Sequence, residues 1–370
     1  MNTYKRFNYL LGRLMSSFFL SIVGFNWLIN PYGITNSPKI KGLNWSKPAT
    51  TDNTRLYKAV DLTRHNAKTI LLGASRIETG INPNSSLLKA YQPAYNLGIP
   101  AATLYEQRRY LEYAIAHQPE LELVILGIDL WLIANPNKTR QGFSEVRLKS
   151  KGLDPIEFVQ INFSVDTLIT SIETIGSNNS GVRYNYYDEN GLRNTEYLSD
   201  RKFTTWLGGP LNRKEYEINR FALENLQLIK EICQKNNIQL IPFITPPHAS
   251  HVEAVYIGGF GHVSEEMKRE IVKIMPVWDF YGYNSITTEP LDSVTNYRDS
   301  SHMTIEVGDL ILSRILQKSK KTVPLDFGIK ISPDNIESEL AKIRANRERW
   351  LEEQPETVKF LHSLKRRSRS

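Results

Sequence analysis

The feature that most constrains the fold is a series of short apolar runs separated by helical patterns. The runs are TILLG (69–73), AYNLG (94–98), LELVILGID (121–129), IQLIPFITP (238–246) and VWDFYG (277–282). Continuous apolar runs are typical of strands covered on both faces, as in a parallel sheet. Helical patterns lie between them at 103–117, 214–235, 264–274 and 305–316, the first opening at capping-box spacing with Thr103 and Glu106. This alternation predicts a doubly wound α/β sandwich.

The expected division of the chain has four parts. We predict an N-terminal signal anchor at 1–30, a connector at 31–52, an α/β domain at 53–318 and a helical basic tail at 319–370. An insertion at about 131–210, with a helix at 164–175, either shapes a substrate site or is a surface excursion. Its tyrosines Tyr184, Tyr186 and Tyr187 either form a sugar-stacking surface or fill a local core. In the tail, Ser332 is the predicted cap of a helix with Pro333 at its first position.

The N-terminus has the pattern of a membrane anchor. Three cations and no acid precede a run that is apolar from Leu14 to Ile29, and counting back to Tyr9 reaches the roughly 20 residues that span a bilayer. Arg13 would then extend its guanidinium to the interface. Positive flanks stay in the cytoplasm, so we expect the rest of the chain outside it, anchored by a single pass. The alternative is a buried N-terminal helix of a cytosolic protein.

The net charge of +7 comes from the two ends of the chain. Lys5, Arg6 and Arg13 lie at one end, four cations lie between 365 and 369, and the body between them is close to neutral. A neutral body does not suit a nucleic-acid surface, so we expect no nucleic-acid partner. Cys233, the single cysteine, excludes an intrachain disulfide and is expected in the core, on a helical stripe with Leu226 and Ile229.

Two segments bring together the residue types of a serine nucleophile and its base. Ser75 follows the first core strand in the small-residue turn GAS, and ligands of α/β sheets bind at the carboxyl ends of strands. A serine needs a base to remove its proton and an acid to orient that base. In NYRDSSHMT, Asp299 and His302 are three residues apart just before a helix. The alternative for each residue is structural: a turn former, a loop cap and a helix-start residue.

With these blocks in order, the chain resembles the SGNH, or GDSL-like, hydrolase and acyltransferase superfamily. LLGASRIETG resembles the first block with Ser75 as nucleophile, YNLGIPAAT the second, LVILGIDLW the third, and DSSH the final Asp-x-x-His. The resemblance spans roughly residues 68–316. It implies a three-layer α/β/α sandwich with a mainly parallel sheet in flavodoxin-like order, and a triad of Ser75, His302 and Asp299.

The resemblance also implies an oxyanion hole, and there the chain departs from the pattern. The backbone N–H groups of Ser75 and Gly98 are the implied donors. Asp129 stands where the family has a hydrogen-bond-donating asparagine, and an ionised aspartate would repel the developing negative charge. Either Asp129 points away, or it is protonated, or Asn96 or another donor compensates.

The functional expectation is acyl transfer or ester hydrolysis on the outer face of the cytoplasmic membrane. Anchored proteins of this kind are similar to those that acylate cell-envelope polysaccharides beside a membrane-bound acyltransferase, which implies an acyl donor and a glycan acceptor. The alternative is a catalytically inactive glycan-binding or assembly protein that retains the fold. We expect no cofactor and no metal: His248, His251 and His262 have no carboxylate at a recognised metal-ligand spacing and are expected to be hydrogen-bonded scaffolding.

Overall fold

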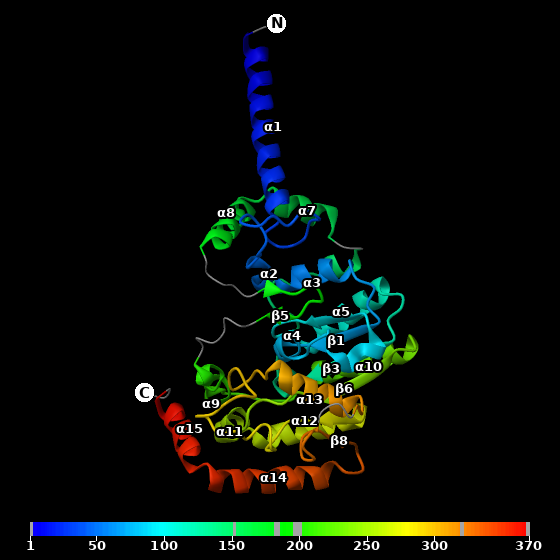
Figure 1. The fold of residues 1–370 in the computed structure, drawn as a ribbon, viewed down its shortest axis with the longest axis vertical. Coiled ribbons are helices and arrows are strands. Elements are labelled where there is room, and N and C mark those ends of the chain that lie inside the picture. The colour runs from blue at the N-terminus through cyan, green and yellow to red at the C-terminus, as the bar shows by residue number, and fades with distance from the viewer. Residues whose placement is uncertain (1–2, 151–152, 181–185, 195–201, 319–321, 368–370) are drawn as a thin grey trace. The chain divides into compact units, whose positions relative to one another are not determined.

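The computed structural model describes residues 3–150, 153–180, 186–194, 202–318 and 322–367 (Figure 1). The chain forms two compact units, one of residues 1–64 and 144–187 and the other of residues 65–143 and 188–370. The first unit thus takes in the predicted connector and part of the predicted insertion. Tyr184 lies outside the described residues.

The first unit contains the long N-terminal helix and several short elements. They are α1 (Thr3–Ile29), α2 (Ala49–Asp52), α3 (Thr54–Leu62), η2 (Arg147–Lys149), α7 (Pro155–Asn162), α8 (Val165–Asn179) and β4 (Tyr186–Tyr187). The predicted insertion helix is α8, capped by Ser164, whose hydroxyl accepts from the N–H of Asp166. Tyr187 stacks on Tyr57 with ring centroids 4.8 Å apart, so this tyrosine helps to fill a local core, whereas Tyr186 is 41% exposed.

The second unit holds the sheet. Its strands are β1 (Thr69–Gly73), β2 (Ala94–Gly98), β3 (Leu123–Ile128), β5 (Arg193–Asn194), β6 (Gln239–Ile244), β7 (Val277–Asp279) and β8 (Ile329–Ile331). Its longer helices are α5 (Leu104–His117), α10 (Arg220–Lys235), α11 (Ala249–Gly258), α12 (Gly261–Ile274), α13 (Ile305–Ile315), α14 (Ile336–Glu353) and α15 (Pro355–Arg367). Its short helices are α4 (Ser75–Gly80), η1 (Ser86–Tyr91), α6 (Leu130–Ile133), η4 (Phe203–Trp206) and α9 (Gly208–Asn212).

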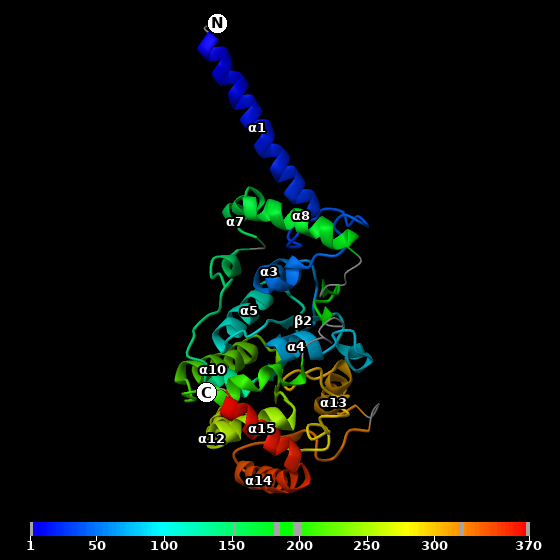
Figure 2. The same cartoon turned by 90° about the vertical axis from the view of Figure 1, so that its left-hand side faces the viewer.

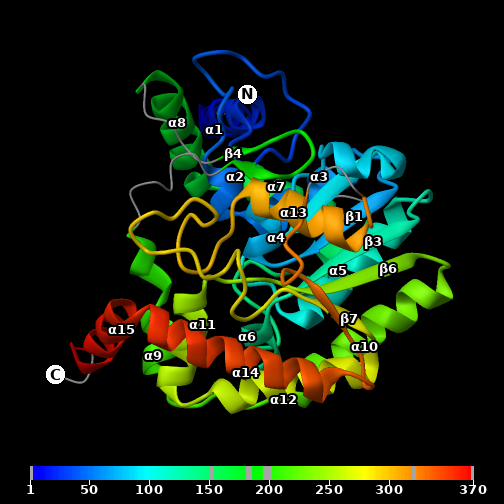
Figure 3. The ribbon, with the colours of Figure 1, turned by 60° about the horizontal axis from the view of Figure 1, so that its bottom comes forward.

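The main sheet has the order β2-β1-β3-β6-β7-β8, in which all neighbours are parallel except β7 and β8. Every residue of β1, β2 and β3 is buried, as expected for strands covered on both faces. Figure 3 shows α13 on one face and α5 and α10 on the other. Leu71, Ile125 and Phe243 pack with Val307 and Ile311 of α13 in one core cluster. The predicted α/β class, with its mainly parallel sheet, apolar N-terminal helix and C-terminal helices, is confirmed.

Several helix boundaries and one strand differ from the prediction: α12 begins at Gly261 rather than at 264, and α8 continues to Asn179 rather than ending at 175. The helix predicted from Lys214 begins at Arg220, because Asn219 caps it by accepting from the N–H of Phe221. The tail helix begins at Ile336 rather than after Ser332, whose N–H donates to the side chain of Asn335. The predicted helical tail also supplies β8, which pairs antiparallel with β7 at the edge of the sheet. Short edge strands carry little periodicity, so the sequence pattern gave no sign of it.

Cys233 is fully buried in α10 together with Leu226 and Ile229, and burial raises the pKa of its thiol to about 12. The expected core position is therefore confirmed.

Candidate active site

Ser75 lies at the first position of α4, directly after β1. Ala74 precedes the helix in extended conformation (φ −98°, ψ −152°), so the chain turns sharply between strand and helix. A Cβ atom at Gly73 would lie 2.3 Å from the side chain of Ile77, and one at Gly98 would lie 2.2 Å from the N of Glu78. These two glycines allow α4 to pack tightly on the ends of β1 and β2, which holds the serine at the carboxyl edge of the sheet.

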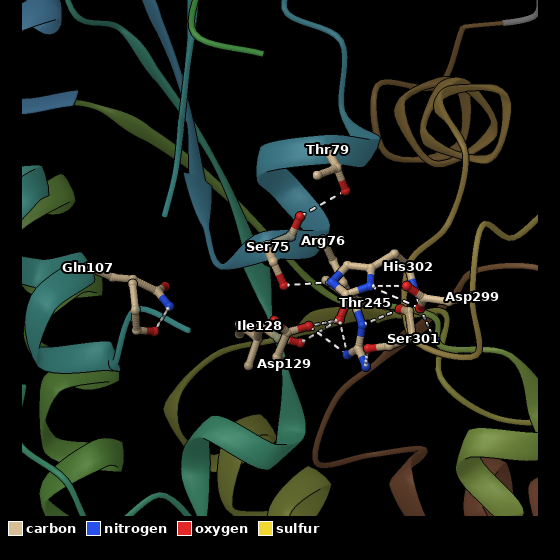
Figure 4. Close-up of polar contacts among 11 residues, drawn as sticks. Ser75, Arg76, Thr79, Gln107, Ile128, Asp129, Thr245, Asp299, Ser301 and His302 are labelled. Atoms are coloured by element: carbon tan, nitrogen blue, oxygen red, sulfur yellow. Dashed lines mark hydrogen bonds and ion pairs between the residues drawn. The ribbon is translucent and has the colours of Figure 1, made fainter. Parts of the chain in front are cut away.

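The structure brings together the three residues of the predicted triad (Figure 4). Ser75 Oγ is 2.9 Å from His302 Nε2, and His302 Nδ1 is 2.9 Å from one carboxyl oxygen of Asp299 and 3.0 Å from the other. The bond to the carboxylate favours a proton on Nδ1, which leaves Nε2 to accept from the serine hydroxyl. Residues 227 positions apart thus form one hydrogen-bonded chain.

Asp299, the acid of the predicted triad, lies in the loop before α13. Asp299 accepts from its own loop, through the N–H groups of Ser301 (2.8 Å) and His302 (2.9 Å), and from Trp206 Nε1 (3.0 Å). Burial by itself would raise the pKa of Asp299, but the hydrogen bonds and charge of His302 and the two backbone donors outweigh it and lower that pKa. Asp299 is therefore an ionised hydrogen-bond acceptor at neutral pH, with a side chain 5% exposed, beside an imidazole 16% exposed.

The carboxyl of Asp129 is taken up by Arg76, the residue next to Ser75. Arg76 Nη1 lies 2.7 Å from Asp129 Oδ1, and the side chains are 3% and 1% exposed. The hydroxyl of Thr245 also donates to this oxygen. The same guanidinium donates to the carbonyl (2.7 Å) and hydroxyl (3.0 Å) of Ser301. Asp129 therefore forms a buried ion pair with Arg76.

The other two predicted oxyanion groups, on Gly98 and Asn96, make hydrogen bonds within the protein. The N–H of Gly98 donates to Asn96 Oδ1 (2.9 Å), so that N–H is already used within β2. The amide of Asn96 donates to the carbonyls of Ile77 (2.8 Å) and Ile81 (2.9 Å) and fixes α4 on the sheet. The Asn96 amide thus holds the helix that carries Ser75, and the N–H of Gly98 orients the Asn96 side chain.

The two histidines of the PPHASH segment differ. His248 caps α11: its Nδ1 accepts from the N–H of Ser250, its Nε2 donates to the carbonyl of Glu289, and burial lowers its pKa to about 4. Burial likewise lowers the pKa of His251 to about 3, but its buried Nδ1 has no partner among the described residues. Within those residues no group of histidine, cysteine or acidic side chains is arranged to hold a metal ion.

Sequence reasoning assigned no role to Arg76, Thr245 or Trp206. Arg76 directly follows the predicted nucleophile but is 53 residues from Asp129, so the sequence offers no local signal for their pairing. Thr245 directly follows β6, and Trp206 lies in the predicted insertion, where nothing in the local pattern points to Asp299.

Comparison with known proteins does not assign the chain to a family. No protein-family model and no curated protein matches the sequence. Among solved structures, this chain is similar to one titled a "putative acylhydrolase" from Bacteroides fragilis. The identity is 12%, the TM-score is 0.36, and the match covers 71% of this chain and 94% of that chain. No functional argument rests on this likeness.

Proposed function

We propose that the protein catalyses serine-dependent acyl transfer or ester hydrolysis of the SGNH type. The observation that carries this proposal is the hydrogen-bonded chain from Ser75 Oγ through the imidazole of His302 to the carboxylate of Asp299. A serine, a base within hydrogen-bond reach and a third group that orients the base are the parts that nucleophilic acyl chemistry requires.

In this mechanism Ser75 Oγ attacks the carbonyl carbon of the acyl donor while His302 Nε2 takes the hydroxyl proton. The tetrahedral intermediate collapses to an ester of Ser75, and the leaving group takes the proton from His302. An acceptor hydroxyl or water then loses its proton to His302 and attacks the ester, which returns free Ser75. Asp299 orients the ring and stabilises the imidazolium in both halves of the reaction.

The backbone N–H of Ser75 is the proposed oxyanion donor. It belongs to the first turn of α4, where a backbone N–H has no partner inside the helix. Gly98, Asn96 and Asp129 do not share this role, because each is committed to another contact. Loss of one oxyanion donor typically costs about 3 kcal/mol, so we expect slow turnover of simple esters.

The proposed location is the outer face of the cytoplasmic membrane. Helix α1 has 27 residues and a window of mean hydropathy 1.3, and it is the one helix among the described residues that is long and apolar enough to span a bilayer. Its cationic N-terminal end, with Lys5, Arg6 and Arg13, favours a cytoplasmic N-terminus and an extracytoplasmic second unit.

We further propose a cell-envelope polysaccharide as acceptor, with the acyl group supplied by a membrane-bound acyltransferase. A cleft of about 600 Å³ beside α6 supports a polyhydroxylated ligand. It is lined by Trp131, Asn135, Asn137, Arg140 and other polar residues, a planar and polar set that suits a sugar ring and its hydroxyls. The amide nitrogen of Asn135 and the Nε of Arg140 are buried there without a hydrogen-bond partner among the described residues.

The proposal is tested by labelling the full chain in detergent with a fluorophosphonate probe, which reacts with activated serines. We expect labelling of the wild type and of Ser363→Ala, a matched change at a half-buried helix position in α15, and none of Ser75→Ala. Equal labelling of wild type and Ser75→Ala would refute the assignment of the nucleophile. In cells, Ser75→Ala should abolish acylation of the envelope glycan.

A further inference from the structure

The helices α7 and α8 in the first unit have their polarity reversed. A helix on a water-exposed surface normally buries its apolar side chains and presents polar ones. In α8 the buried side chains are the polar Thr167, Ser171 and Thr174. Six large apolar side chains on α7, its C-cap and α8 are instead between 46% and 68% exposed: Ile156, Val159, Phe163, Val165, Ile169 and Ile172. We name these six residues the α7–α8 apolar face.

The apolar face follows the period of each helix. Ile156, Val159 and Phe163 are spaced i, i+3, i+7, and the residues of α8 are spaced i, i+4, i+7, so each set forms one stripe. Contiguous exposed apolar surface of this kind marks a site of contact with another molecule or with a membrane.

The buried polar side of these helices holds the end of α1. Asn26, in the last turn of α1, donates to the carbonyl of Asn162 in α7 (2.9 Å) and accepts from the hydroxyl of Ser171 in α8 (2.9 Å). Asn26 is 1% exposed. Figures 1 and 2 both show α7 and α8 lying crosswise at this end of α1. The α7–α8 apolar face therefore begins where the candidate membrane-spanning helix ends.

Two exposed tryptophans lie in the same region. Trp27, in the last turn of α1, is 43% exposed, and Trp45 is 64% exposed. The residue after Trp45, Ser46, exchanges backbone hydrogen bonds with the side chain of Asn178 at the end of α8. Tryptophan is enriched at the boundary between lipid and water, so its presence here points to a lipid partner.

We propose that the α7–α8 apolar face lies in the interface of the bilayer that α1 crosses. This inference depends on membrane insertion of α1 and not on the acyl chemistry. The sequences of α7 and α8 contain no lysine or arginine and include Glu157, Asp166 and Glu173. The apolar face itself therefore offers no cation to anionic lipids, and apolar contact is its proposed means of association. With this second contact, α7, α8 and the segments packed on them would be held at the membrane surface at a fixed angle to α1.

The test places an environment-sensitive fluorophore at single cysteines of the full chain in vesicles of phosphatidylcholine alone. The background is Cys233→Ala, which removes the buried native thiol. Ile169→Cys reports the centre of the apolar face, Glu173→Cys is the matched exposed position at its polar flank, and Lys235→Cys is an exposed position in the second unit. Quenching is measured with lipid-borne nitroxides and with aqueous iodide.

We expect several-fold stronger quenching by the lipid nitroxide at residue 169 than at residue 235, an intermediate value at 173, and the reverse order with iodide. Addition of anionic lipid or 0.5 M salt, about a 4 Å screening length, should leave the order of lipid-nitroxide quenching unchanged. A probe at residue 169 that iodide quenches as well as one at 235 would overturn the proposal. Vesicle flotation of the same samples separates this result from a failure of α1 to insert, and Ser75→Ala should leave all ratios unchanged.

Discussion

Two clusters of polar side chains lie at the ends of the strands, and they differ in how far they are exposed to solvent. In the first, Ser75, His302 and Asp299 form a chain in which the imidazole is 16% exposed. In the second, Arg76 and Asp129 are 3% and 1% exposed, and the guanidinium donates to Asp129, Thr245 and Ser301. The first is partly open to solvent, as the proposed proton transfer to a substrate requires, whereas the second has its charges paired and enclosed.

The second cluster indicates how the fold tolerates an aspartate at position 129, where the family that the sequence resembles has an asparagine. A buried carboxylate without a partner would be strongly unfavourable, and Arg76 provides that partner from the residue next to the nucleophile. Because Arg76 also binds the carbonyl of Ser301, it links the turn that carries Ser75 to the loop that carries His302. The open cluster is thus expected to determine reactivity, and the enclosed cluster to determine stability and alignment.

The largest expected effect is at the open cluster. Asp299→Asn should lower kcat for a model ester by about 10⁴-fold, or about 5.5 kcal/mol, because an amide can hold the imidazole in the wrong tautomer. Stability should change by less than about 1 kcal/mol, since the asparagine oxygen can still accept from the loop N–H groups. Ester hydrolysis and urea denaturation check the two expectations. A large loss of stability with unchanged kcat would show that Asp299 acts in folding rather than in catalysis, contrary to this expectation.

The enclosed cluster should respond in the opposite way. Arg76→Met leaves Asp129 buried without its cation and should destabilise the fold by about 3–5 kcal/mol. The double variant Arg76→Met/Asp129→Leu removes both charges and should recover most of that loss, as measured by denaturant unfolding. If the double variant is no more stable than Arg76→Met, the ion pair is not the source of the effect.

The buried His248 should make the stability of the fold sensitive to acid. Burial lowers the pKa of His248 to about 4, from about 6.5 in an unfolded chain. As pH falls from 6.5 to 4 the unfolded state binds a proton that the folded state does not, so about 3 kcal/mol of stability is lost. His248→Asn keeps an N-cap acceptor for α11 and should remove that part of the acid sensitivity. Denaturation at pH 7 and pH 4.5 measures it, with the exposed His362→Asn as control.

The smallest effect is expected at Trp206, which donates to Asp299 from outside its loop. Trp206→Phe keeps the aromatic ring near His302 and loses one hydrogen bond to a charged group. We expect about a tenfold decrease in kcat, or about 1.4 kcal/mol, with KM unchanged. The pH–rate profile of kcat should also shift along the pH axis, because Asp299, the carboxylate that orients the imidazole, loses a hydrogen bond. An unchanged profile with a raised KM would place Trp206 in substrate binding instead.

The sequence by itself determined the elements that repeat a strong local pattern. The strands at TILLG, AYNLG and LELVILGID, the helix capped by Thr103, and the apolar N-terminal helix follow from periodicity, capping and length. The spacing of Asp299 and His302 is also local, and the structure confirms their contact. Weaker patterns failed: the short edge strand β8 has too few residues to show a period.

Only the tertiary structure decided which long-range polar partners meet. That Asn96 donates to Ile77, that Asp129 meets Arg76, and that Trp206 reaches Asp299 depend on the packing of several elements. The reversed polarity of α8 became visible for the same reason, since a helical stripe in a sequence does not state which side faces the protein. Periodicity is a property of neighbouring residues, whereas the partner of a buried charge is set by where the whole chain brings its segments together.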